Sequence, residues 1–196
     1  PVPDALYRAL LGHCRHARPP QAYATRNLGL AREVVQCYFT DALISSSRSL
    51  PLAEVRGVLQ ASSRAGDAEG ALGLLQFLIG QSQERGGGAG PARMLMDEFL
   101  FFLVVKACCV EGDGGVTVVK NTRALSAVAP LLSEMEGLGI AKSSFLYSVA
   151  LKGYGRMGWK NRVEEMGNEM MEKRSEVKVD RVAMNSLLDA RSGGGV

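Results

Sequence analysis

The sequence predicts an all-α protein, a right-handed α-solenoid built from helix–turn–helix repeats. Three observations lead to this prediction. Apolar residues recur at helical spacing through most of the chain, no segment shows sustained alternation of apolar and polar residues, and one helix–glycine–helix pattern returns several times. A solenoid is expected because each helical hairpin buries its apolar face only by packing against neighbouring hairpins.

The composition is that of a folded protein, with 46% hydrophobic and 22% charged residues in a chain of 196. The longest apolar run, Phe99–Val105, is much shorter than the about 20 residues that cross a bilayer, so no membrane-spanning segment is expected. The net charge of +3 suits nucleic acid only if the positive side chains collect on one face. Because the chain opens with Pro1 and has no initiator Met, we expect it to be a piece of a longer polypeptide.

The cysteines and histidines indicate neither a disulfide framework nor a metal site. The four cysteines are Cys14, Cys37, Cys108 and Cys109. Their irregular spacing predicts buried free thiols in a reducing compartment. His13, Cys14 and His16 have no second pair at ligand spacing, so neither a metal nor another cofactor is expected. No nucleophile–histidine–carboxylate set is evident either, and we predict that the chain is not an enzyme.

A repeated helix–glycine pattern defines the hairpins. In each copy an apolar helical stretch ends in small or basic residues and then a glycine, which predicts the end of a first helix. The copies are residues 59–66, 105–112 and 151–158, with a fainter one at 10–17 that has Ala17 in place of the glycine. A second amphipathic stretch follows each glycine, for example residues 68–79, so each unit predicts an αα-hairpin. Pro130 lies inside one second helix and is expected to kink or break it.

The repeat length needs two loop insertions. Gly66, Gly112 and Gly158 are 46 residues apart, a spacing typical of HEAT-type repeats. The glycine-rich stretches 81–91 and 112–121 are typical of loops, however, and removing about ten residues from each leaves roughly 35. The predicted segments are a degenerate hairpin at 1–51, repeats with inserts at 52–97 and 98–143, the best-matching repeat at 144–180, and a truncated first helix at 181–196.

The clearest opening-helix pattern is Phe145-Leu-Tyr-Ser-Val-Ala-Leu-Lys-Gly-Tyr-Gly-Arg-Met-Gly158, and its start returns in residues 181–190. On these residues the chain resembles the pentatricopeptide repeat family, whose helical hairpins repeat every 35 residues or so. Residues 63–72 also fit the family's central turn. The resemblance covers residues 52–190 with two inserts and is poor before them. The family's usual proline ahead of the repeat-closing residue is replaced by Lys142 and Val179.

The resemblance implies binding of single-stranded RNA, without chemistry, in a mitochondrion or chloroplast. It assigns base reading to Ser148 with Asp180, a pair that favours guanine, and to Asn185. Unpaired bases stack on flat apolar groups while polar side chains read their edges. The stacking candidates are Phe145, Val182 and Phe99, and the candidates for phosphate contact are Arg15, Arg64 and Arg156. Arg56 and Phe102 hold the reader positions of the two preceding repeats, and neither is a standard reader.

Simpler roles remain open for the same residues. Asp97 and Asp180 suit helix N-caps, Ser148 suits an ordinary exposed helix position, and the arginines suit helix C-termini. Core packing is the other interpretation of the aromatic residues Phe99, Phe101, Phe102, Tyr147 and Tyr154. For the whole chain, the alternatives are a protein–protein scaffold, such as an organellar ribosome subunit, and the binding part of a larger enzyme.

Overall fold

The computed structural model describes residues 9, 12, 28–38, 52–83, 96–109, 122–173 and 177–192. Within these ranges the chain is all-helical, and no strand occurs. Residues 28–38 are helical. The helices that follow are α3 (Leu52–Ala65), α4 (Ala68–Gln83), α5 (Glu98–Cys109), α6 (Thr122–Ser126), α7 (Val128–Gly137), α8 (Ser144–Arg156), α9 (Lys160–Glu172) and α11 (Arg181–Arg191). Most of the segment predicted at 1–51 lies outside the described residues.

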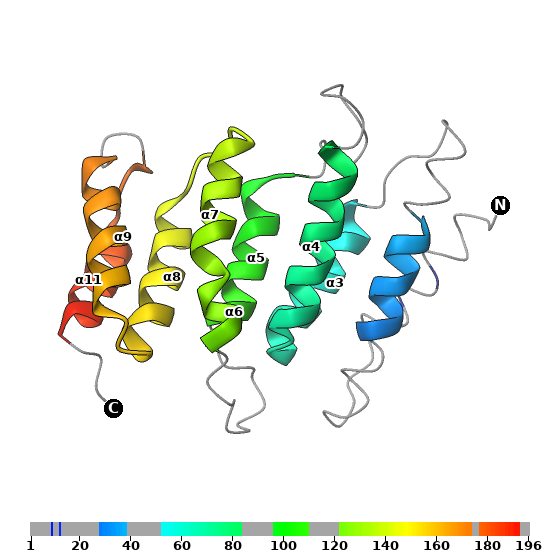
Figure 1. The fold of residues 1–196 in the computed structure, drawn as a ribbon, viewed down its shortest axis with the longest axis horizontal. Helices are drawn as coiled ribbons and strands as arrows, with labels where there is room; N and C mark the ends of the chain where they lie inside the picture. The colour runs from blue at the N-terminus through cyan, green and yellow to red at the C-terminus, as the bar shows by residue number, and fades with distance from the viewer. Residues whose placement is uncertain are drawn as a thin grey trace.

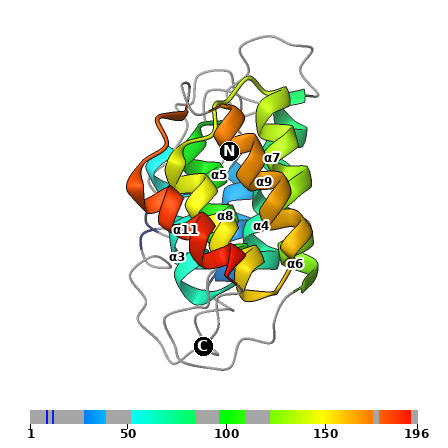
Figure 2. The ribbon, with the colours of Figure 1, turned by 90° about the vertical axis from the view of Figure 1, so that its left-hand side faces the viewer.

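The helices form two layers along the long axis of the molecule (Figure 1). One layer contains α3, α5, α8 and α11, and each of these helices packs on the next one in that order. The end-on view shows α4, α6, α7 and α9 on the opposite side (Figure 2). Contacts of α3 with α4, α5 with α7, and α8 with α9 join the layers. We call α3, α5, α8 and α11 the first layer, and the others the second layer.

Two glycines make the turns that join the layers. Gly66 follows α3 with φ 68°, and Gly158 follows α8 with φ 70°, in the left-handed region that side chains with a Cβ disfavour. In both turns the next amide reaches back five residues, from Asp67 N to the Ser62 carbonyl (2.9 Å) and from Trp159 N to the Tyr154 carbonyl (3.0 Å). This pattern satisfies carbonyls that the end of a helix leaves free. At α3 and α8 the recurrent glycine therefore ends the first helix for a conformational reason, and Gly112 lies outside the described residues.

Pro130 divides the second-layer segment after α5, as the sequence predicts. The segment forms two helices, α6 and α7, separated by a turn at Ala127. Ala127 is the N-cap of α7, which places Pro130 in the first turn of that helix. A proline is tolerated there because the first amides of a helix have no intrahelical acceptor. The break therefore lies just before the proline, and α7 continues undisturbed to Gly137.

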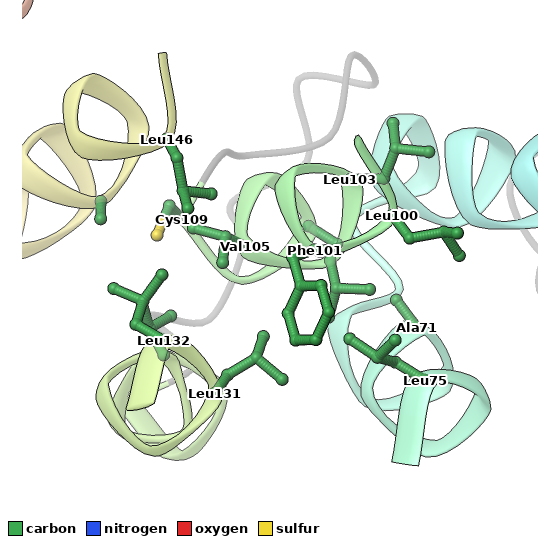
Figure 3. Packing of buried hydrophobic residues seen from close by; sticks show 14 of the residues in the cluster. Ala71, Leu75, Leu100, Phe101, Leu103, Val105, Cys109, Leu131, Leu132 and Leu146 are labelled. Atoms are coloured by element: carbon green, nitrogen blue, oxygen red, sulfur yellow. The ribbon is translucent and has the colours of Figure 1, made fainter. Parts of the chain in front are cut away.

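The core runs between the two layers and includes most of the predicted apolar stripes. Phe101 of α5 is fully buried and points toward Leu75 of α4 and Leu131 of α7 (Figure 3). Tyr147 and Tyr154 of α8 are also buried, in agreement with the core-packing interpretation. Phe99 and Phe102 differ from that interpretation, because Phe99 is exposed and Phe102 is half-buried. Phe101 and Val105 are four positions apart, a spacing that keeps both on the same buried face of the helix.

The cysteines correct one prediction. Cys37, Cys108 and Cys109 are free, as expected, but only Cys109 is fully buried: Cys108 is half-buried, and Cys37 is exposed. It lies near the end of the helical stretch 28–38, on the face away from the buried Val35 and Tyr38. Burial raises the pKa of the Cys108 thiol to about 12 and that of Cys109 further still. Cys14 lies outside the described residues.

A charged cluster around the buried Lys142 joins α7, α8 and α9. Lys142 is almost completely buried, and its Nζ lies 3.0 Å from Oε1 of Glu136 and 2.5 Å from Oε1 of Glu169. Lys173 contacts the same two carboxylates. The hydrogen bond from Lys173 is the larger cause, and that from Lys142 the next, of a pKa of Glu136 that lies below its usual range. The Tyr147 hydroxyl donates to Glu169 (2.9 Å), so α7, α8 and α9 meet at one polar centre.

Candidate nucleic-acid interface

An apolar row runs across the first layer on its outer surface. The large apolar side chains that are exposed in the described residues are Leu30, Phe99, Phe145, Met171, Val182 and Leu188. Phe99, Phe145 and Val182 occupy one equivalent place, the second residue of α5, α8 and α11. Their exposed fractions are 45%, 64% and 49%. Single exposed apolar residues are ordinary, but an equivalent one on three consecutive packed helices forms a surface.

N-terminal caps set the start of these helices and therefore the place of the row. The side chains of Asp97, Ser143 and Asp180 accept hydrogen bonds from the amides three residues later, at 3.0, 3.3 and 2.8 Å. Each cap satisfies an amide that would otherwise lack a partner. The residue two positions after each cap then faces solvent, at the same height along each helix. The capping interpretation of Asp97 and Asp180 is therefore confirmed as one of their roles.

An apolar cleft separates the N-terminal turns of α5 and α8. Its volume is about 340 Å³, and it is lined by Glu98, Phe99, Phe102, Ser143 and Phe145. The rings of Phe99 and Phe102 stack with centroids 6.1 Å apart and planes at 21°. Phe145 forms the other wall, from the neighbouring helix. We call this the aromatic cleft. It presents three flat rings within one opening to solvent.

Arg56 of α3 closes one end of this surface. Its guanidinium forms an ion pair with Asp97 and lies over the Phe99 ring, 5.6 Å from the ring centroid. Asp97 thus caps α5 and holds the side chain of the preceding first-layer helix. Arg56 holds the position that the resemblance gives to the base reader of segment 52–97, and Asp97 is the last residue of that segment. In this structure they bind each other.

The three base-reading candidates differ in accessibility. Ser148 is buried, and its hydroxyl donates to the Ser144 carbonyl (2.8 Å). The Asp180 carboxylate caps α11 and accepts from the Ser144 hydroxyl (3.1 Å). Asn185 is exposed on α11. Ser148 and Asp180 thus both hydrogen-bond to Ser144 of α8, whereas Asn185 faces solvent.

Positive side chains lie beyond the apolar row, toward the C-terminal ends of the first-layer helices; Lys152 is exposed, and Lys106 is half-buried. Lys106 and Lys152 lie seven residues after Phe99 and Phe145, which on a helix places them on the same face about 10 Å farther along. Arg64 and Arg156, two of the phosphate-contact candidates, are exposed at the ends of α3 and α8. None of these four cations, which we call the basic band, has an ion-pair partner among the described residues. Arg15 lies outside them.

Lys106 and Lys152 were not among the predicted site residues, although the sequence contains a signal for them. Both hold the ninth position of a first-layer helix, seven after an exposed phenylalanine. The equivalent residue of α11 is Asp189, which is exposed and negative. The basic band therefore covers α3, α5 and α8 and ends before α11.

The part of the chain that the structure describes contains no group of three or more potential metal ligands, and no helix in it is long and apolar enough to cross a membrane. His13, Cys14 and His16 lie outside that part. In comparisons with known proteins, no family model and no curated protein matches this sequence. The site is therefore defined by its own geometry, an apolar row beside a basic band.

Proposed function

We propose that this chain is a non-enzymatic scaffold that binds single-stranded RNA along the exposed face of the first layer. The observation that carries the proposal is the parallel course of the apolar row and the basic band on α5 and α8. Single-stranded nucleic acid is bound by such surfaces because its bases stack on flat side chains while its phosphates need cations. Phe99 with Lys106 and Phe145 with Lys152 supply one such pair on each helix.

The repeat architecture supports the same proposal. We take α3–α4, α5–α7 and α8–α9 as consecutive pentatricopeptide-like hairpins of a right-handed solenoid, with α11 as the first helix of the next one. Packing of α3 on α5, α5 on α8, and α8 on α11 is the arrangement that such stacking requires. As in the family that the sequence resembles, the expected setting is RNA processing, stability or translation in a mitochondrion or chloroplast.

The test is the salt dependence of binding to a pool of single-stranded RNA, measured by fluorescence anisotropy. If the four cations of the basic band each contact a phosphate, log K falls against log salt with a slope of about −3, since each contact on a single strand contributes about −0.7. The double variant Lys106→Gln/Lys152→Gln is expected to reduce the slope to about −1.4.

The matched control removes a cation from the opposite layer. Lys160→Gln alters an exposed lysine at the start of α9, and its slope is expected to equal that of the unaltered chain. A flat salt response, or equal effects of the first-layer and second-layer variants, contradicts the proposal.

The second candidate function is a protein–protein scaffold, such as a subunit associated with an organellar ribosome. Two observations favour it: Arg56 is held by Asp97, and Ser148 is buried, so two candidate reader positions offer no free polar group. An apolar row also suits a protein partner. This function predicts that the chain retains an organellar ribosomal protein. It also predicts that the affinity of the chain for RNA does not change with salt.

A further inference from the structure

We propose that a groove between α7 and α9 binds an arginine side chain presented by a partner protein. Both helices belong to the second layer, opposite the helices that carry the apolar row (Figure 2). The groove is therefore separate from the proposed RNA-binding surface, and each can be tested without the other. We call it the α7–α9 groove.

Side chains from three helices line the α7–α9 groove. Ser133 and Glu136 come from α7, Arg162 and Glu165 come from α9, and Tyr154 reaches the groove from α8. The volume is about 200 Å³, which is below the range of about 300 to 1,000 Å³ for sites that bury a whole small molecule. A groove of this size suits one long side chain of a larger partner.

The Tyr154 hydroxyl is the group that points to a ligand. Tyr154 is 1% exposed, and its hydroxyl has no hydrogen-bond partner among the described residues. Buried hydroxyls are nearly always hydrogen-bonded, because burial removes water as a partner. Burial is the main cause of the raised pKa of Tyr154, while the charge of Arg162 lowers this pKa and that of Glu165 raises it, which places the hydroxyl near both. An N–H donor in the groove would supply the partner that the hydroxyl oxygen lacks.

The charge around the groove favours a cation. The helices α7 and α9 together carry six glutamates and two basic residues, whereas α8 of the first layer carries two basic residues and no acidic one. Two carboxylates of the lining, those of Glu136 and Glu169, already bind the buried Lys142. Glu165 instead pairs with Arg162 at 2.7 Å, and both side chains are more than half exposed. An exposed pair of this kind contributes little to stability, so a cation from a partner can replace Arg162 on Glu165.

Arginine fits this arrangement better than lysine. The planar guanidinium has five N–H donors in a fixed fork and can reach a carboxylate and a hydroxyl together, whereas the lysine ammonium is a strongly hydrated point charge. Glu165 accepts two of these donors, and the Tyr154 oxygen accepts a third. Glu164 and Glu172 are exposed on the same helix and attract a basic segment of the partner.

The test compares the affinity of the full chain for two dye-labelled peptides of equal charge, hexa-arginine and hexa-lysine, by fluorescence anisotropy. Hexa-arginine is expected to bind more tightly. Glu165→Gln is expected to weaken its binding by roughly 10- to 100-fold, and Tyr154→Phe by roughly 2- to 10-fold. Arg162→Gln frees the Glu165 carboxylate and is expected to tighten the binding by up to roughly 5-fold.

Two controls exclude general charge attraction and loss of folding. Glu164→Gln removes the same charge from the next residue of α9, which pairs with Arg191 outside the groove (3.3 Å), and its expected affinity is that of the unaltered chain. Tyr154→Phe keeps the ring that stacks on Trp159 and removes a hydroxyl without a partner among the described residues, so urea denaturation is expected to show no loss of stability.

Four results overturn the inference: no binding of hexa-arginine, equal affinity for the two peptides, equal effects of Glu164→Gln and Glu165→Gln, or full affinity in Tyr154→Phe. Each of them leaves the proposed binding of RNA by the first layer intact.

Discussion

Replacing Phe101 with alanine is expected to lower the free energy of unfolding by about 3 to 5 kcal/mol. Phe101 is fully buried in α5, and α5 contacts α3, α4, α6, α7 and α8. Removing the ring leaves a cavity between the layers that Leu75 and Leu131 cannot fill without moving (Figure 3). Because a typical domain is stable by only about 5 to 15 kcal/mol, this loss is a large fraction of the total. Guanidinium denaturation followed by circular dichroism measures it.

Phe99→Ala is the matched control for this prediction. It makes the same chemical change two residues earlier, at a side chain that is 45% exposed. Its packing on Phe102 and its contact with Arg56 are expected to be worth about 1 kcal/mol, so the loss of stability is much smaller. RNA affinity is expected to fall in Phe99→Ala more than the stability change explains. Equal destabilisation by the two variants contradicts the division of α5 into a core face and a binding face.

Replacing Gly155 with leucine is expected to lower the free energy of unfolding by about 1 to 3 kcal/mol. A Cβ atom at Gly155 of α8 would lie 2.8 Å from both Cα and Cβ of Ala190 in α11. A backbone atom cannot turn aside as a flexible side chain can, so α8 and α11 must separate. That separation disturbs the last contact in the first layer, and thermal or guanidinium unfolding measures its cost.

Gly73→Leu is the matched control for this second substitution. Gly73 lies inside α4, is exposed, and has no atom within 4 Å of the place where a Cβ would be. Leucine is a much better helix former than glycine, so this variant is expected to gain about 0.5 to 1 kcal/mol. The two identical substitutions should therefore have opposite signs. A gain in stability from Gly155→Leu shows that α8 and α11 are not in close contact.

The sequence was sufficient for those parts of the fold that depend on local patterns. Apolar periodicity predicts an all-helical chain, and the glycine pattern predicts the turns at Gly66 and Gly158, since a left-handed residue is needed there. The break near Pro130 follows from the missing amide of proline. These features each need only a few neighbouring residues, which is why the sequence alone indicates them.

Contacts between distant segments could not be predicted in the same way. Arg56 is held by Asp97, 41 residues later, and Ser144 donates to Asp180, 36 residues later. Such pairs depend on how neighbouring hairpins are packed, a property that no local pattern contains. For the same reason, the burial of Ser148 was not foreseen. The shared helix faces could have been predicted, because Phe99 with Lys106 and Phe145 with Lys152 have the same seven-residue spacing in the sequence.

The most direct test of the account is photo-crosslinking of the full chain to single-stranded RNA that contains 4-thiouridine, with the linked peptides identified by mass spectrometry. The account predicts crosslinks in α5 and α8, at residues near Phe99, Lys106, Phe145 and Lys152. It predicts none in α4, α7 or α9, whose helices form the opposite layer (Figure 2). Crosslinks confined to that second layer, or an absence of crosslinks at RNA concentrations that saturate binding, would contradict the assignment of the first layer as the RNA-binding surface.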